Sequence, residues 1–486
     1  MAQERISTGI PGLDDVLCGG LTANRLYLIE GVPGTGKTTL AFQFLLEGVR
    51  RGEPVLYVSL SETRDEIRDV AASHGWSLEG VTVRELVPAA DTLDAGEQYT
   101  VFHPSEVELS ETTERIVQDV ESIQPRRVVF DSLSELRLLA ATPLRYRRQI
   151  LALKQFFAGR NCTVLLLDDL TSSAHDLQVQ SIAHGALLLG IATPAYGGER
   201  RRLSVTKFRG SAFRGGHHDY VIRQGGMAVF PRLVAAESRG DSSRTRMSSG
   251  LAELDLLLGG GLERGTSTLI HGPAGTGKST IAALFAVEAA RRGLRSALYI
   301  FDESASTLVR RMAGLGHDLR GPIEAGLVTV REVDPAEMSP GELAHAIRHA
   351  VDHDGATIVA IDSLNGYLNS VPDEKFLIVQ MHELLSWLGH RGVASILVAA
   401  QAGMFNGAMA APIDASYLAD SVVLLRYFEA EGAVRQAISV VKMRGGDHER
   451  TLRSFTTAGG RIVVGEPLRH YQGVLSGVPR PRAGPA

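Results

Sequence analysis

The sequence is poor in cysteine, with only Cys18 and Cys162 among its 486 residues. Two cysteines exclude a disulfide framework and a cysteine-based zinc module, and they fit the reducing environment of the cytoplasm. An excess of positive charge is also missing, because the formal net charge is −5. This balance disfavours nucleic acid and anionic membranes as partners. We therefore expect a cytoplasmic protein that does not bind nucleic acid.

Long apolar runs are absent as well. The first ten residues mix charges early and contain no apolar signal core, and no uninterrupted apolar stretch reaches the length that a bilayer requires. Apolar segments such as 392–400 predict buried strands instead. Hydrophobic residues make up 44% of the chain and charged residues 22%, which is typical of a globular protein with a sizeable core. No membrane association is expected.

What the sequence does contain is one unit written twice. Ser7 and Ser248 open similar segments, and Gly31 and Gly272 open similar glycine-rich loops, both at an offset of 241 residues (248 − 7 and 272 − 31). A register held over this length indicates a tandem duplication, in which each copy is a domain with its own core. The predicted division is a first domain at 1–236, a polar linker at 237–246, a second domain at 247–475 and a disordered tail at 476–486.

Within each copy, short apolar runs alternate with segments of helical periodicity. These runs are continuously apolar, which indicates strands that are covered on both faces. The pattern predicts an α/β fold with mostly parallel sheets flanked by helices. The predicted strands lie at 25–31, 54–60, 126–132 and 163–169 in the first copy and at 266–272, 296–302, 357–363 and 395–401 in the second.

Both copies carry the phosphate-loop pattern G-x-x-x-x-G-K-[ST]. Its glycines let backbone N–H groups surround phosphate oxygens, its lysine (Lys37 or Lys278) reaches the β- and γ-phosphates, and its hydroxyl (Thr38 or Ser279) binds Mg²⁺. Each loop follows a predicted strand and opens a predicted helix, so a purely structural turn is the weaker interpretation. The predicted nucleotide-binding residues are Gly31, Val32, Pro33, Gly34, Thr35, Gly36, Lys37, Thr38, Thr39, Gly272, Pro273, Ala274, Gly275, Thr276, Gly277, Lys278, Ser279 and Thr280.

A carboxylate at the end of a neighbouring strand is the expected companion of such a loop, because it completes the Mg²⁺ shell. One apolar strand of each copy ends in aspartate, at Asp131 and at Asp362. The alternative is an aspartate that caps the following turn. The predicted metal-binding residues are Thr38, Asp131, Ser279 and Asp362.

Hydrolysis also needs a group that positions or activates water. Glu62 in the first copy, and Asp302 and Glu303 in the second, follow the strand after the loop helix, at the edge where such folds place their chemistry. The alternative is a helix N-cap cluster, since Ser61, Thr63 and Ser304 are good caps.

Two cations alternate on a late strand of each copy, in a K-x-R-G motif. Lys207 and Arg209 form the first pair, and Lys442 and Arg444 form the second. Because alternate residues of a strand share a face, both cations of a pair point the same way and suit nucleotide phosphates supplied by a neighbouring subunit. The alternative is a solvated strand face.

Taken together, these motifs resemble the KaiC family of the RecA superfamily, and the resemblance extends over essentially the whole chain. It implies tandem RecA-like P-loop domains, a double-ring homohexamer with ATP and Mg²⁺ between subunits, and catalytic cations that act in trans. It further implies an ATPase first ring, a second ring with serine/threonine autokinase and phosphatase activity, and clock or signalling proteins as partners.

The sequence departs from the family pattern at three positions. The resemblance places a phosphorylated pair at Ser416 and Tyr417, where tyrosine replaces a Ser/Thr and puts its oxygen too far from the backbone. Ser416 keeps a suitable hydroxyl and is the predicted phosphosite, with an ordinary loop serine as the alternative. Asp302 replaces one of the family's two glutamates, and Ser61 removes one carboxylate from the first copy, which predicts a first ring that binds ATP more than it hydrolyses it unless Glu62 compensates.

Two other functions remain open at this point. One is a nucleic-acid-dependent motor of the same superfamily, which the negative charge and the lack of basic loops interleaved with aromatics disfavour. The other is an ATP-sensing scaffold without kinase activity.

Overall fold

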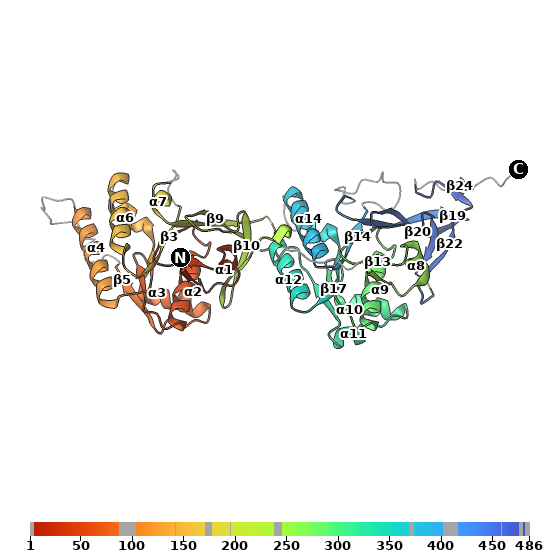
Figure 1. Ribbon diagram of the computed structural model, residues 1–486, viewed down its shortest axis with the longest axis horizontal. Helices are drawn as coiled ribbons and strands as arrows, with labels where there is room; N and C mark the ends of the chain where they lie inside the picture. Colours follow the sequence, from red (N-terminus) through yellow and green to blue (C-terminus); the bar gives the residue numbers. More distant parts are fainter. Residues whose placement is uncertain are drawn as a thin grey trace. The chain divides into compact units, whose positions relative to one another are not determined.

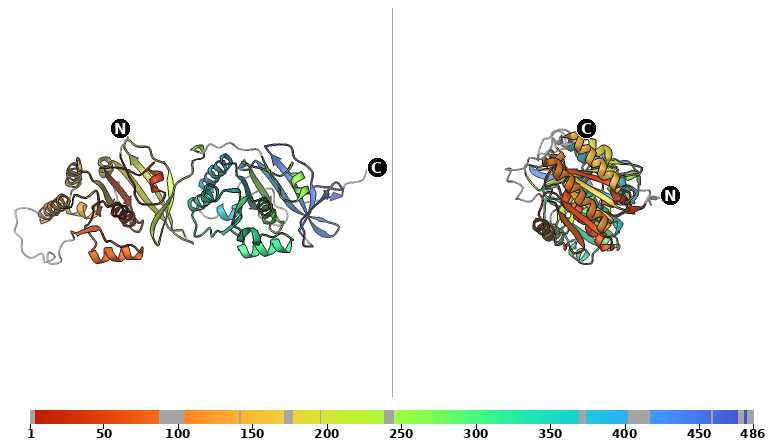
Figure 2. Two further views of the ribbon diagram at one scale, coloured as in Figure 1. Left: turned by 60° about the horizontal axis from the view of Figure 1, so that its bottom comes forward. Right: turned by 90° about the vertical axis from the view of Figure 1, so that its left-hand side faces the viewer.

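The computed structural model describes residues 4–86, 104–140, 142–170, 177–194, 196–237, 245–368, 374–401, 417–457, 459–475 and 480–481. The chain divides into two compact units, Met1–Arg232 and Leu233–Ala486. Each is built around one nine-stranded sheet with helices on both faces (Figures 1 and 2). The predicted α/β class with tandem, mostly parallel sheets is therefore confirmed.

The first sheet is parallel over six strands and antiparallel at one end. Its phosphate-loop strand β3 lies between β8 and β7, and β8 through β5 run parallel. The antiparallel strands β9, β10 and β11 extend the sheet beyond β8. The strands in spatial order are β11 (Gly226–Phe230), β10 (His217–Arg223), β9 (Arg200–Phe208), β8 (Gly185–Ala192), β3 (Leu26–Gly31), β7 (Thr163–Asp168), β6 (Arg127–Asp131), β4 (Val55–Ser59) and β5 (Val81–Glu85).

The second sheet repeats this plan. Its strands β16 to β19 in the spatial order below run parallel, and β20 to β22 add an antiparallel extension. The strands in spatial order are β16 (Val328–Glu332), β15 (Arg295–Ile300), β17 (Ala356–Asp362), β18 (Ala394–Ala400), β14 (Ser267–Gly272), β19 (Ser421–Ala430), β20 (Ala433–Met443), β21 (Arg453–Thr456) and β22 (Val463–Pro467).

Helices and small strand pairs complete each unit. The first unit holds α1 (Leu13–Val16), α2 (Lys37–Arg50), α3 (Arg64–Ser73), α4 (Pro104–Ile123), α5 (Leu133–Ala140), α6 (Pro143–Phe157), α7 (Leu177–Ile182) and the pair β1 (Arg5–Ile6) with β2 (Leu21–Thr22). The second holds η2 (Ala235–Glu237), α8 (Ala252–Leu257), α9 (Lys278–Arg291), α10 (Ala305–Gly314), α11 (Arg320–Glu324), α12 (Pro340–Asp352), α13 (Leu364–Leu368), α14 (Glu374–His390), and the pairs β12 (Arg246–Met247) with β13 (Leu262–Glu263) and β23 (Tyr471–Gln472) with β24 (Arg480–Pro481).

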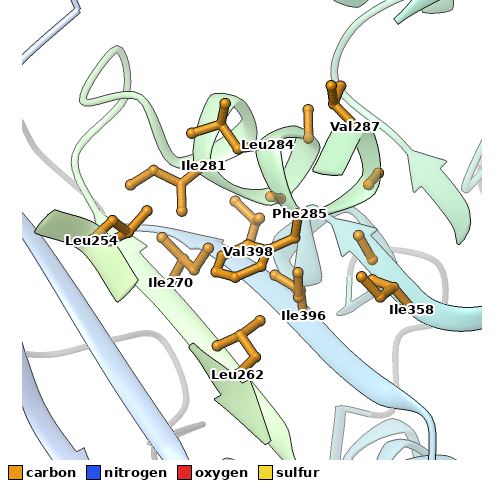
Figure 3. Close-up of a cluster of buried hydrophobic side chains, with 14 of the residues drawn as sticks. Leu254, Leu262, Ile270, Ile281, Leu284, Phe285, Val287, Ile358, Ile396 and Val398 are labelled. Carbon is orange, nitrogen blue, oxygen red and sulfur yellow. The ribbon is translucent and has the colours of Figure 1, made fainter. Parts of the chain in front are cut away.

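Each sheet buries both faces, which explains the continuous apolar runs. In the first unit, Ile29 and Tyr57 face the core under α2, while Leu28 and Val58 face the core under α4 to α6. Successive side chains of a strand point to opposite faces, so both cores draw on the same strands. The second unit has the same two layers. Figure 3 shows the layer under α9, formed by Leu254, Leu262, Ile270, Ile281, Leu284, Phe285, Val287, Ile358, Ile396 and Val398.

The packing boundary between the units lies ahead of the expected linker. Leu233 and Ala235, which the sequence analysis assigned to the first domain, belong to a core of the second unit. Of the expected linker, the described part includes Arg246 in β12, and residues 238–244 lie outside the described residues. Of the expected tail, Arg480 and Pro481 form β24. Across the described residues, every helix is too short or too polar to cross a bilayer.

Candidate nucleotide-binding sites

The first phosphate loop joins the end of β3 to the start of α2. Gly34 and Gly36 adopt left-handed φ values of 81° and 88°, which favour glycine. No side chain caps α2 at Gly36, and a Cβ on Gly34 would meet nothing within 4 Å. The first N–H groups of the helix are therefore not capped by a side chain, which suits a phosphate-binding helix start. The second loop repeats the conformation, with Gly275 at 78° and Gly277 at 92°.

The lysine of the first loop is buried and paired. Lys37 exposes only 6% of its side chain and donates to the Gly31 carbonyl over 2.8 Å and the Val32 carbonyl over 3.2 Å. Its ammonium also contacts the Asp169 carboxylate at 2.7 Å. The cation that should meet phosphate thus lies at the loop, held by a carboxylate from the neighbouring strand.

The lysine of the second loop has different surroundings. Lys278 donates to the Pro273 carbonyl over 2.7 Å. Burial lowers its pKa, and the negative charges of Asp362 and Asp302 act in the opposite direction. Ala400 ends β18, the strand beside the loop strand. The acidic partner of the first lysine has no counterpart at that strand end.

The expected Mg²⁺ ligands of the first site lie together. Thr38 donates its hydroxyl to Asp131 Oδ2 over 2.7 Å, and Tyr57 donates to the same oxygen over 2.7 Å. Burial is the main cause that raises the pKa of Asp131. A buried carboxylate next to a hydroxyl suits a hard divalent cation, which would compensate the buried charge and take its remaining ligands from phosphate and water.

The second site brings together the same pair of groups. Burial is the larger cause that raises the pKa of Asp362 to about 6, whereas the Ser279 hydroxyl, which lies near this carboxylate, lowers that pKa. Glu303 and Asp302 add to this rise through their negative charges. The predicted metal-binding residues therefore lie side by side in both domains.

The predicted acid of the first site faces the same region. Glu62 Oε2 is buried and accepts no hydrogen bond from the described residues. Burial raises the pKa of Glu62, and Asp131, Glu66 and Asp169 raise it further. The Ser59 hydroxyl bonds both backbone groups of Glu62 and so fixes the turn that carries it.

The two acids of the second site differ from each other. Glu303 forms a bidentate ion pair with Arg311 of α10, with N···O distances of 2.9 and 2.7 Å. Asp302 instead accepts a hydrogen bond from the Ser363 hydroxyl over 2.7 Å, and this neutral partner does not offset its negative charge. The capping alternative holds for neighbouring residues, because Ser304 caps α10 and Thr63 caps α3.

Three of the four late-strand cations contact backbone carbonyls, and the fourth contacts a carboxylate. Lys207 donates to the Gln180 carbonyl, and Arg209 donates to the Ser181 carbonyl over 2.8 Å. In the second domain, Lys442 donates to the Ala419 carbonyl over 2.7 Å, and Arg444 lies 3.5 Å from Asp420. Both pairs are thereby anchored to the segment that precedes the parallel strand beside the loop strand.

The predicted phosphosite, Ser416, lies outside the described residues. Its neighbour Tyr417 is described and about half exposed.

Several residues at the sites escaped the sequence analysis. Asp169 had a usable signal, since it is the second of two acids directly after an apolar strand. Tyr57 lies inside a strand, and Arg311 lies on a helix eight residues after its partner Glu303. No sequence pattern therefore indicates a role for either residue. Their positions depend on how α10 and β4 pack, which spacing alone does not give.

Comparison with known proteins agrees with this geometry. The family model for the KaiC ATPase matches residues 6–234 and again residues 247–469. The chain is 27% identical to the circadian clock protein KaiC3 of Synechocystis, over 98% of this chain and 94% of that one. It is 28% identical to the circadian clock oscillator proteins KaiC of Picosynechococcus and Synechococcus elongatus, in each case over 98% of this chain and 92% of the relative. With two family matches that cover most of its length, this chain belongs to the KaiC ATPase family.

Proposed function

We propose that both sites bind ATP with Mg²⁺ and hydrolyse it, and that the chain assembles as a double-ring homohexamer. The second domain phosphorylates and dephosphorylates its own serine, and the protein serves signalling or circadian-type timing in the cytoplasm. The observation that carries the nucleotide chemistry is the repeated pairing of a loop hydroxyl with a buried strand-end aspartate, Thr38 with Asp131 and Ser279 with Asp362.

Nucleotide phosphates fit the glycine loops because the start of α2 and of α9 presents uncapped N–H groups. Lys37 and Lys278 neutralise the phosphate charge. Thr38 with Asp131, and Ser279 with Asp362, hold Mg²⁺, which when bound supplies charge stabilisation for phosphoryl transfer.

The group that orients water differs between the two sites. In the first site it is Glu62, whose buried Oε2 has no hydrogen-bond donor among the described residues. In the second site it is Asp302, because Arg311 neutralises Glu303 through two hydrogen bonds. Each site thus uses one acid, at a different position of the acidic turn.

The late-strand cations Lys207, Arg209, Lys442 and Arg444 act on the nucleotide of the adjacent subunit. The resemblance to the family supports this role, and hydrogen bonds to backbone carbonyls hold the Arg209 and Lys442 side chains in place. Native mass spectrometry with ATP and Mg²⁺ tests the assembly. A hexamer that the Arg444→Ala variant fails to form or to activate supports the role in trans, and a monomer under all conditions contradicts it.

Autophosphorylation is tested by intact mass after incubation with ATP and Mg²⁺. Wild type should gain one phosphate, and Ser416→Ala should gain none. Tyr417→Phe is the matched control, because it removes the neighbouring hydroxyl and keeps the aromatic side chain. A gain that survives in Ser416→Ala and disappears in Tyr417→Phe places the phosphate on tyrosine. No gain in any chain while ATP is consumed leaves an ATPase whose output is conformational.

The nucleic-acid motor makes the opposite prediction in a simple assay. Salt-dependent binding to single-stranded DNA that requires ATP would favour it over the timing ATPase.

A further inference from the structure

The ammonium group of Lys37 has no hydrogen left for a phosphate. A lysine carries three N–H donors, and here three acceptors surround them: the Gly31 carbonyl at 2.8 Å, the Val32 carbonyl at 3.2 Å and Asp169 Oδ1 at 2.7 Å. The two carbonyls belong to the loop itself. A phosphate oxygen that reaches Lys37 must therefore replace the Asp169 carboxylate.

Asp169 is held in place by its other oxygen. The hydroxyls of Ser132 and Ser134 donate to Oδ2 over 3.1 and 3.3 Å. These serines follow β6, whereas Asp169 follows β7, so two strands fix the carboxylate beside the loop. When Lys37 turns to another anion, Asp169 remains next to that anion as a negative charge.

The second site is built without this carboxylate. Val164 N donates to the Arg25 carbonyl, and Ser395 N donates to the Thr266 carbonyl, so these residues take equivalent places in β7 and β18. Counting forward from them, Ala400 stands where Asp169 stands. Asn365 takes the place of Ser134 and exchanges hydrogen bonds with the backbone of Ala400 over 3.3 and 2.8 Å. A neutral amide and a methyl group therefore replace the acid.

We infer that Asp169 is a specificity residue that disfavours the γ-phosphate, so that the first site selects ADP over ATP relative to the second. This inference rests on the proposed nucleotide binding. A loop lysine reaches both β- and γ-phosphates. ADP leaves the γ position empty and lets Asp169 stay near Lys37, whereas ATP brings a terminal phosphate against a fixed like charge. Like charges built against one ligand are a common source of selectivity.

The test uses the full chain with Lys278→Ala, so that nucleotide binding reports the first site. Calorimetry gives Kd for ADP and for a non-hydrolysable ATP analogue, both with Mg²⁺, in chains carrying Asp169 or Asp169→Asn. Asparagine keeps the shape and removes the charge. We expect the analogue to bind at least about 10-fold tighter in the Asn chain, equivalent to about 1.4 kcal/mol. The Kd of ADP should change less than about 3-fold.

The reciprocal variant guards against a local folding defect. Ala400→Asp in a Lys37→Ala chain places the acid in the second site, and it should weaken binding of the ATP analogue more than binding of ADP. Equal changes for both nucleotides in both variants would overturn the selectivity, as would unchanged affinities with a loss of turnover alone, which would make Asp169 a water-orienting group. Failure of both nucleotides to bind with either residue at position 169 would overturn nucleotide binding at the first loop itself.

Discussion

The two phosphate loops share a backbone and differ in the charges around it. Both use left-handed glycines, an uncapped helix start and a hydroxyl paired with a buried aspartate. In the first loop, Asp169 pairs with the lysine. Among the described residues no cation pairs with Glu62, because Val70 stands where α10 of the second domain carries Arg311. The second keeps Asp302 and neutralises Glu303. The two copies share the phosphate loop and differ in the residues to which we assign selectivity and turnover.

The largest effects should come from the loop lysines. Lys278→Ala should reduce turnover at the second site by about 10²- to 10³-fold, since a phosphate clamp is lost. Lys37→Ala should remove the smaller share of total ATP turnover. The first site has Ser61 where the second has the acid Asp302, and Lys37 already pairs with Asp169. Steady-state phosphate release from each variant measures this. If Lys37→Ala removes the larger share, the assignment of the two sites is reversed.

A core position gives a comparison of stability. Arg127 is fully buried and forms an ion pair with Glu53 over 2.5 Å. In the second domain, the positions equivalent to Arg127 and Glu53 hold the apolar residues Ile358 and Leu294. Arg127→Ile should lower the free energy of unfolding of the first domain by about 3 kcal/mol, because it removes the cationic partner of the Glu53 carboxylate.

The double variant Glu53→Leu with Arg127→Ile installs the pair found in the second domain and should recover most of that loss. Calorimetry of the four chains of this cycle measures the coupling. Additive losses would show that the pair does not act as a unit.

The acids should separate the sites further. Glu62→Gln should lower turnover at the first site by about 100-fold, as expected for a lost general base. The aligned Glu303→Gln should change turnover at the second site by less than about 3-fold, because Arg311 already neutralises that carboxylate. Single-site turnover in Lys278→Ala and Lys37→Ala backgrounds measures each effect. Comparable losses would mean that Glu303 acts despite its ion pair.

The smallest expected effect is a change in stability with pH, and it concerns His184. This residue is equivalent to Asp420 of the second domain, because the backbone N–H of each bonds the loop strand at the same position. Burial, together with Arg25 and Arg209, lowers the pKa of His184 to about 4. The unfolded chain therefore binds the proton more readily, so stability should fall as the pH drops from about 6.5 toward 4 and stay level above that window. The loss should be about 1 kcal/mol after solvent screening. His184→Gln should flatten this part of the Tm-against-pH curve, and an unchanged curve would exclude the assignment.

The fold class and the phosphate loops could be read from the sequence, and the charge relations could not. Continuous apolar runs and the repeated loop pattern are local signals, so they predict parallel strands and Lys37 directly. Asp169 and Lys37 are far apart in the chain, and their contact depends on β7 lying beside β3. The sequence predicted a late strand with the K-x-R-G motif in each copy, found as β9 and β20, but it did not predict their antiparallel pairing, because half-exposed strands with mixed side chains carry no signal of direction.

Two residues that the sequence analysis assigned to the end of the first domain help to hold the second domain together. Leu233 and Ala235 are buried in the core beside α14, where Glu383 accepts the Ala235 N–H over 2.9 Å and the His390 ring bonds the Ala235 carbonyl over 3.1 Å. A cut at the polar stretch after Glu237 would therefore take these residues from the half that buries them. That half would be left with an open apolar groove and an unmatched carboxylate. To remain soluble when expressed alone, the second half needs to start before Leu233.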